Sequence, residues 1–315
     1  MIVAATRHRN QTTHSPVGLN GSHMPGDKLG FEHKSLLHDR LKRVCAPLSQ
    51  YSFANLYLFR AIHDYHVLTV PEGIFIAGKT YEGGRFLMPT EELRKERTED
   101  VLRLLKEGEF LFPVPEEWLG AFTGKEVLSD FSENDSDYVY TVEKLLTYQG
   151  HKLHGQKNLL NQFLSRCVPE ARPLTQDRME DAREVLEVWQ TDVGSEKAAT
   201  DYYPCREALE RYDALVLCGG IYYVEHEPAG FIIGEEIRPD MFALHFAKGK
   251  RKFKGLYQYM YNQFAKILPR QYQWLNFEED LGKLALRIAK SSYDPDRVLK
   301  KYRVRKCPGL GKVCG

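Results

Sequence analysis

The stretch that decides the fold reads Met241-Phe-Ala-Leu-His-Phe246, then Ala247-Lys-Gly-Lys-Arg-Lys-Phe-Lys-Gly255, then the pattern of residues 256–268. It predicts a strand, a basic loop and a helix, because apolar residues recur at helical spacing after Gly255. A helix N-terminus presents free N–H groups and the positive end of the helix dipole, which favour an anion. Five of the seven residues from Lys248 to Lys254 are basic. We therefore expect a phosphate or pyrophosphate at this loop.

The chain as a whole is a globular sequence with no strong charge. It has 315 residues, a formal net charge of +1, 43% hydrophobic residues and 28% charged residues. This length predicts two domains. The balanced charge argues against a dedicated, sequence-independent nucleic-acid binder, and we expect no DNA partner. The longest uncharged apolar run, residues 214–224, is far shorter than the ~20 residues of a membrane span.

The cysteines and the chain ends point to a protein of the cytoplasm. None of the six cysteines forms a C-x-x-C pair or has zinc spacing, so we expect reduced thiols and no metal site. Residues 1–30 lack a signal-peptide core and are predicted to be a disordered extension, and residues 307–315 a tail. Because Gly21-Ser-His-Met24 resembles a vector scar, it stays open whether residues 1–23 are native, as does the oligomeric state.

Periodicity and turn signals predict an α/β (α+β) fold in two domains, over residues 31–170 and 171–306. In the first domain we expect helices over residues 35–44, 98–107, 116–122 and 156–167, and strands over 66–70, 73–77, 85–88, 110–114 and 138–142. In the second we expect helices over residues 175–190, 204–217, 256–268 and 279–289, and strands over 220–225, 231–236, 241–246 and 273–276. Each domain should form a mostly antiparallel mixed sheet flanked by helices, so two copies of one small fold are plausible.

Several short motifs carry a resemblance to a known family. They are Tyr138-Val-Tyr140, Gly150-His-Lys-Leu-His-Gly-Gln-Lys-Asn158, Ala229-Gly-Phe231 with Gly234-Glu235, His245 with Lys248, Gly255-Leu-Tyr-Gln258, and Asn276-Phe-Glu-Glu-Asp-Leu-Gly282 with Ser292-Tyr-Asp-Pro295. They resemble soluble proteins similar to the C-terminal domain of phosphatidylglycerol lysyltransferases. The resemblance covers most of residues 138–303 and is most specific over 276–295. It implies two tandem GNAT-like (acyl-CoA N-acyltransferase-like) domains.

One departure from that resemblance concerns the donor. The pyrophosphate loop of GNAT enzymes reads Gln/Arg-x-x-Gly-x-Gly/Ala, whereas this chain has Lys252-Phe-Lys-Gly255-Leu-Tyr257. Tyr257 replaces a small residue that lets the backbone approach the pyrophosphate. No tightly bound cofactor is expected. Acyl-CoA is one candidate donor and aminoacyl-tRNA the other. The expected donor-binding residues are Lys250, Arg251, Lys252, Lys254, Gly255 and Tyr257.

The expected catalytic residues are Glu278, Glu279, His245 and Tyr293. Clustered carboxylates raise one another's pKa, so Glu278 or Glu279 is a candidate base, although acidic residues also cap a helix start. His245 on an apolar strand is more typical of a hydrogen-bonded core residue. Tyr293 and Tyr257 are candidate proton donors, with packing as the alternative.

Further basic segments are candidate substrate contacts. Residues 151–157 enter a helix with positive charge, which the helix dipole disfavours and which therefore indicates function. The expected substrate-binding residues are Lys152, His154, Lys157, Asn158 and Asn276. Residues 300–306 alternate basic and apolar residues, which predicts a final strand with one charged face, or an RNA contact.

Together these features predict an acyl- or aminoacyl-transferase. The acyl group would pass from acyl-CoA or aminoacyl-tRNA to an amine or hydroxyl acceptor, by positioning and a base without a metal. The alternative is a GNAT-like protein that binds a ligand or RNA without catalysis.

Overall fold

The computed structural model describes residues 26–307. Residues 1–25 of the predicted extension lie outside the described residues. Residues 308–315 of the predicted tail also lie outside them. Within residues 26–307, no helix combines the length and the hydropathy that a membrane span requires.

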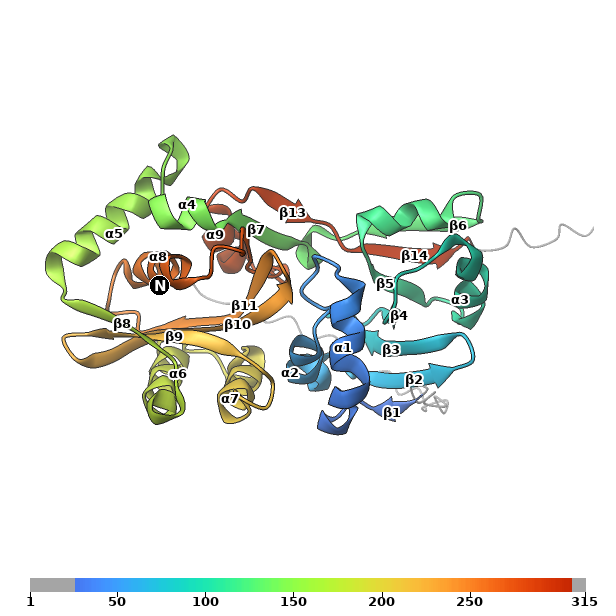
Figure 1. Cartoon of the computed structure of the whole chain (residues 1–315), viewed down its shortest axis with the longest axis horizontal. Coiled ribbons are helices and arrows are strands. Elements are labelled where there is room, and N and C mark those ends of the chain that lie inside the picture. Colours follow the sequence, from blue (N-terminus) through green and yellow to red (C-terminus); the bar gives the residue numbers. More distant parts are fainter. Residues whose placement is uncertain (1–25, 308–315) are drawn as a thin grey trace, which may run out of the picture.

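The described strands form two seven-stranded sheets (Figure 1). The first sheet has the order β1 (Asp27–Lys28), β2 (His66–Val70), β3 (Gly73–Lys79), β4 (Arg85–Pro89), β5 (Phe110–Val114), β14 (Tyr302–Lys306), β6 (Val127–Phe131). The second has the order β13 (Arg297–Leu299), β7 (Asp137–Thr141), β12 (Trp274–Asn276), β11 (Met241–Gly249), β10 (Glu227–Arg238), β9 (Cys218–Val224), β8 (Pro169–Pro173).

The helices flank these sheets. They are α1 (Lys34–Val44), α2 (Phe53–His63), α3 (Thr98–Leu104), α4 (Val142–Thr147), α5 (His154–Arg166), α6 (Met179–Val193), α7 (Tyr202–Glu210), α8 (Leu256–Ile267) and α9 (Leu284–Ser291). At the second sheet, α5 and α8 lie on one face and α6 and α7 on the other (Figure 1).

The two sheets repeat one arrangement. In each, three consecutive antiparallel strands are followed by a helix and then by a strand parallel to the third: β2, β3, β4, α3, β5 and β9, β10, β11, α8, β12. All other strand pairs among the described residues are antiparallel. This confirms the predicted α/β fold with two mixed, mostly antiparallel sheets flanked by helices.

The chain crosses between the sheets more than once. β7 joins the second sheet beside β12, and β14 returns from the C-terminal end to the first sheet between β5 and β6. Both sheets therefore take strands from both sides of residue 170, and the predicted limit at residues 170 and 171 falls within β8. One core also joins the halves, where the ring of Phe59 on α2 stacks on Phe246 of β11 with centroids 6.0 Å apart.

Helix α8 shows how the deciding stretch folds. Leu256, Met260 and Phe264 are buried, as their helical spacing predicts. Ile267 continues the same helical spacing, which predicts that it faces the core, but it is 59% exposed, because α8 ends there and the chain turns away into extended backbone at Leu268.

Other differences have local causes. Helix α2 was not predicted, because its first six residues are all buried and the segment shows no amphipathic pattern. Strands β6 and β8 are short, largely exposed edges and were also missed. The helix expected over 204–217 ends at Glu210. The helix expected over 279–289 begins only at Leu284, so the acidic residues at 278–280 lie in a loop and do not cap a helix.

Candidate functional site

The parallel strands of the second sheet separate at the start of the site. β11 and β12 pair only through Met241–Ala243 and Trp274–Asn276. β12 then ends, whereas β11 continues to Gly249. His245 on β11 and the loop after Asn276 therefore meet just beyond the last paired residues.

His245 lies between two carboxylates at this point. Its Nδ1 is 2.8 Å from Oε1 of Glu278, and its Nε2 is 2.9 Å from Oε1 of Glu235. The ring is fully buried. Burial lowers the pKa of His245, but the charges of Glu278 and Glu235 outweigh burial and raise the pKa to about 10. Both ring nitrogens then carry hydrogen, so His245 is an imidazolium that donates to both carboxylates.

The first turn of α2 closes this cluster from the first half of the chain. The Nδ2 of Asn55 donates to Glu278 at 2.8 Å, and the hydroxyl of Ser52 donates to Glu235. Ser52 also caps α2 by accepting from the N–H of Asn55 at 3.2 Å. The cap that starts α2 thus also fixes it against the second sheet.

A second buried cluster adjoins the first and is centred on Lys301. Its Nζ lies 2.5 Å from Oδ1 of Asp137 and 2.7 Å from Oε2 of Glu279. Burial raises the pKa of Glu279, but Lys301 outweighs burial and lowers it to about 2. Burial raises the pKa of Asp137, and that effect outweighs the attraction of Lys301. Glu279 is therefore a stable carboxylate beside a lysine that stays charged.

The loop that carries Glu278 and Glu279 is held in an uncommon conformation. Glu278 has a φ of 61°, which few non-glycine residues adopt. Its N–H donates to Oδ1 of Asn276 at 2.7 Å. The ammonium of Lys290 donates to the carbonyls of Phe277 and Glu279, both at 2.6 Å, and to that of Glu278 at 3.1 Å. Such over-determined backbone is typical of functional loops.

Asn276, an expected substrate contact, uses its side-chain amide for hydrogen bonds inside the protein. Its Nδ2 donates to the carbonyl of Pro47 at 3.1 Å and to Oδ2 of Asp137 at 2.9 Å. The residue is fully buried. In this conformation it links the end of β12 to the Lys301 cluster.

The basic loop before α8 already has acidic partners. Lys250 is buried and its Nζ lies 2.6 Å from Glu184 and 2.8 Å from Glu227, which also pairs with Lys252 at 2.7 Å. Lys248 is buried, pairs with Asp201 at 2.6 Å and lies over the ring of Trp189. The side chains that reach solvent from this loop are Arg251, Lys252 and Lys254.

The start of α8 is packed by another helix. Gly255 has a φ of 94°, and a Cβ there would lie 2.5 Å from the carbonyl oxygen of Leu159 on α5. Glycine at this position is therefore required by the contact between α5 and α8. The ring of Tyr257 lies against Gly249 at the end of β11.

The remaining predicted residues lie away from the two clusters. Tyr293 is buried among aromatic rings, with Tyr261 at 5.4 Å and Tyr148 at 6.1 Å between centroids, and its hydroxyl accepts from Gln258 at 3.0 Å. On and before α5, Lys152 pairs with Asp294 at 2.8 Å. The side chains of His154, Lys157 and Asn158 are exposed on α5.

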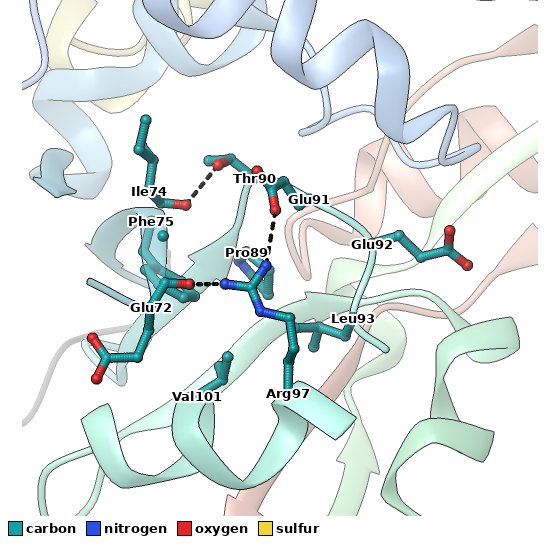
Figure 2. A pocket seen from close by; sticks show the side chains of 11 residues that line it. Glu72, Ile74, Phe75, Pro89, Thr90, Glu91, Glu92, Leu93, Arg97 and Val101 are labelled. Carbon is teal, nitrogen blue, oxygen red and sulfur yellow. Dashed lines mark hydrogen bonds and ion pairs between the residues drawn. The ribbon is translucent and has the colours of Figure 1, made fainter. Parts of the chain in front are cut away.

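Two of the cavities among the described residues bear on the choice of a reaction site. One lies at the junction of the halves and is lined by Gln50, His63, Tyr65, Thr80, Tyr81, Phe86, Phe112, Asp135 and Glu279. The other lies beside β3, β4 and α3 within residues 72–101 (Figure 2). There the guanidinium of Arg97 is already bound by the carbonyl of Glu72 and the carboxylate of Glu91. The junction cavity shares Glu279 with the Lys301 cluster, so it is the better candidate for a reaction site.

Comparison with known proteins agrees with this architecture. The family described as "Phosphatidylglycerol lysyltransferase, C-terminal" matches residues 43–305. The chain belongs to this family. No group of three or more His, Cys, Asp or Glu side chains in residues 26–307 is arranged to hold a metal ion.

Solved structures share the fold of this family member. A conserved protein of unknown function from Bacteroides thetaiotaomicron is 24% identical, with a TM-score of 0.75, covering 89% of this chain and 98% of that one. L-PGS from Bacillus licheniformis is 13% identical, with a TM-score of 0.57, covering 92% and 96%. The C-terminal domain of a protein described as a lysylphosphatidylglycerol synthetase, from Agrobacterium fabrum, is 12% identical, with a TM-score of 0.59, covering 88% and 91%.

One curated relative also matches this family member. An uncharacterised protein of Mycoplasmoides gallisepticum is 21% identical over 196 residues, which is 60% of this chain. The match spans about three fifths of that relative's length, 61%.

Sequence reasoning missed several residues that build the site. Asp137, Glu235 and Lys301 are almost completely buried charges, and none was predicted as a site residue. A signal was present for Glu235, which follows the apolar run Phe231-Ile-Ile233 with only Gly234 between. A charge on a buried strand requires a partner, and His245 on the next strand provides it.

Proposed function

We propose that the protein is an aminoacyltransferase that takes its acyl group from aminoacyl-tRNA and passes it to an amine or hydroxyl acceptor. The observation that carries the proposal is Glu279, which both belongs to the buried charge cluster at the end of β12 and lines the junction cavity. A reacting group in that cavity would lie beside charges that their buried partners hold in place, so its electrostatic surroundings are preorganised. Membership of the lysyltransferase C-terminal family and its GNAT-like fold supports transfer chemistry.

The choice of donor rests on the loop before α8. A CoA pyrophosphate would need free N–H groups and cations there. Instead the N–H of Leu256 donates to the carbonyl of Phe253 at 3.1 Å, Lys250 is neutralised by two glutamates, and Gly255 is packed on α5. These contacts make a CoA pyrophosphate the less favoured donor group at this loop. The exposed side chains Arg251, Lys252 and Lys254 suit the looser phosphate contacts of an RNA donor.

In this proposal neither Glu278 nor Glu279, the two predicted bases, accepts the proton. Glu278 is bound to His245, and Glu279 to Lys301. Carboxylates held in this way orient cations and shape the field of the cavity, and a proton acceptor must be another group. His245 is likewise occupied on both nitrogens.

The same pairing also favours the alternative of a binding protein without catalysis. Glu278 and Glu279 both form ion pairs with cations inside the protein, as purely structural carboxylates do. The two proposals differ in turnover: the binding protein retains RNA or ligand affinity but transfers no acyl group from any donor.

Equilibrium binding tests the donor first. We expect bulk aminoacyl-tRNA to bind the full chain with an affinity that falls steeply with salt, and CoA to show no binding at millimolar concentration. The plot of log K against log salt has a negative slope. Replacing Arg251 and Lys252 together by alanine should make that slope shallower by about 1–2. The control removes the same charge from α3 and the loop after it, at Arg103 and Lys106, and should leave tRNA affinity unchanged. Micromolar CoA binding, or an unchanged slope, would overturn the choice of donor.

A further inference from the structure

The junction cavity contains polar atoms that no described residue satisfies. It has a volume of about 20 Å³, which is room for one ammonium-sized group, and it opens to solvent. Tyr65 lines it and is only 4% exposed, yet its hydroxyl has no hydrogen-bond partner in residues 26–307. The hydroxyl is not sealed from solvent as that of Tyr222 is, so it faces the opening of the cavity. It is therefore free to bind a polar group that enters there.

His63 adds a second unused atom. Its Nδ1 lies 2.9 Å from the carbonyl oxygen of Lys79, so Nδ1 carries the hydrogen and donates, and Nε2 keeps its lone pair. Within the described part of the chain, Nε2 has no partner. Burial lowers the pKa of His63, which keeps the ring neutral at neutral pH. The ring is fixed by stacking on Tyr65, with centroids 5.2 Å apart.

The charges around the cavity favour a cation. Oε2 of Glu279 accepts from Lys301 at 2.7 Å, and within residues 26–307 its carboxylate has only one other side-chain partner, Nε2 of Gln50 at 3.4 Å. Asp135 gives Oδ2 to Arg303 at 2.6 Å and leaves Oδ1 without a described partner. Asp137 and Glu82 share the same two cations. The charge of Lys290 also acts on Glu279. Four carboxylates thus face three cations, and the net charge is still negative.

Aromatic rings form much of the remaining wall. They belong to Tyr65, Tyr81, Phe86 and Phe112. Aromatic faces beside carboxylates attract organic ammonium groups. A metal ion fits less well, because no metal-binding group of three acidic, His or Cys side chains occurs among the described residues.

We propose that the junction cavity binds the ammonium group of an acceptor amine, with Nε2 of His63 as its proton acceptor. The ammonium lies against Glu279 and Asp135, and the Tyr65 hydroxyl completes its contacts. This inference rests on the proposed transfer function and narrows its acceptor to an amine.

The step balances without a further reactant. The ammonium gives one proton to Nε2 of His63, and the free amine attacks the acyl carbon of the donor ester. The C–N bond forms as the C–O bond to the tRNA breaks. The second proton of the nitrogen leaves on the departing oxygen, and His63 returns its proton to solvent. The products are an amide, a free hydroxyl on the tRNA and one proton.

Binding of n-butylammonium to the full chain, measured by NMR with n-butanol as the uncharged isostere, tests the site. A ligand with so few heavy atoms should bind at about millimolar affinity. We expect n-butanol to bind at least about tenfold more weakly, because it lacks the charge that the carboxylates select. Equal affinity for the two probes, or no binding of n-butylammonium, would overturn the proposal.

Variants connect the binding to the cavity. Tyr65→Phe removes the unused hydroxyl, and Glu279→Gln one charge; each should weaken n-butylammonium about tenfold. Tyr51→Phe is the matched control, because that buried hydroxyl donates to the carbonyl of Pro113 outside the cavity at 2.9 Å. Should Glu279→Gln not fold, Tyr65→Phe decides alone, and unchanged affinity in it overturns the site.

The assay separates this inference from the proposed function. Amine binding is measured without any donor, so its loss contradicts the cavity site even if transfer to a hydroxyl is found. Transfer is measured with aminoacyl-tRNA, and its absence contradicts the proposed function even if n-butylammonium binds. His63→Gln should retain n-butylammonium affinity while lowering the transfer rate by about 100-fold or more. An unchanged rate would remove His63 from the proposal.

Discussion

Nδ1 of His245 lies 2.8 Å from Oε1 of Glu278, across the gap that opens where β12 ends and β11 continues. The contact joins the strand that leads to α8 to the loop that carries both predicted carboxylates. Glu235 accepts from the other ring nitrogen. Two carboxylates therefore share the single positive charge of the imidazolium. Asn55 and Ser52 extend the cluster to α2, so the same contact helps to join the two halves of the molecule.

The first prediction concerns the stability that this imidazolium provides. His245→Gln leaves Glu235 and Glu278 buried without a cation, so we expect a loss of about 3–5 kcal/mol in the free energy of unfolding. Urea denaturation measures it. His154→Gln, on the exposed face of α5, is the control and should change stability by less than about 0.5 kcal/mol. A similar small change in His245→Gln would show that the cluster contributes little.

The second prediction is a dependence of stability on pH. The folded pKa of His245 is raised to about 10, whereas an unfolded histidine titrates near 6.5. Between these values the folded state binds one more proton, so the contribution is fully present below about pH 6.5 and is lost as the pH rises towards 10. Stability should fall by about 1.4 kcal/mol per pH unit from this group. The difference between the wild type and His245→Gln should therefore shrink from pH 7 to 9; a constant difference would contradict the prediction.

The third prediction compares a glycine that the packing of α8 on α5 requires with a glycine on α5 that it does not require. Gly255→Ala introduces a Cβ 2.5 Å from the carbonyl of Leu159 at a φ of 94°, so we expect a loss of more than about 1 kcal/mol. Gly155→Ala on α5 meets nothing within 4 Å, and alanine there should stabilise the helix by up to about 1 kcal/mol. Thermal unfolding of both variants measures the contrast. If Gly255→Ala is neutral, the helices can separate, and the start of α8 is open to a phosphate after all.

These contacts show which parts of the molecule the sequence could predict. The strand, loop and helix around Gly255 were expected correctly, because apolar spacing and turn residues act over a few positions. The pairs that build the site were not, since Asn55 and Glu278 are 223 positions apart and only packing brings them together. Lys250 shows the same limit. Its run of basic neighbours predicted a phosphate site, but Glu184, 66 positions away, supplies one of its partners.

The last prediction concerns the loop between β12 and α9. Lys290 donates to three consecutive carbonyls in it, those of Phe277, Glu278 and Glu279, and burial lowers the pKa of Lys290. Lys290→Met retains the aliphatic stem but removes this donor from all three carbonyls; that of Glu278 keeps the N–H of Tyr138 at 3.2 Å. Glu278, at its positive φ, then loses one of the contacts that oppose relaxation of the backbone, and keeps the bond from its N–H to Asn276.

We expect faster amide hydrogen exchange in this variant across residues 277–283 and no change across β10 and β11, because the strand ladders remain intact. Lys283→Met is the control, since that exposed ammonium only reaches the carbonyl of Ala199 at 3.3 Å. If exchange in the loop is unchanged, the His245 and Lys301 clusters alone are sufficient to fix Glu278 and Glu279. If exchange rises there, Lys290 is the residue that positions both carboxylates, including the one that lines the cavity.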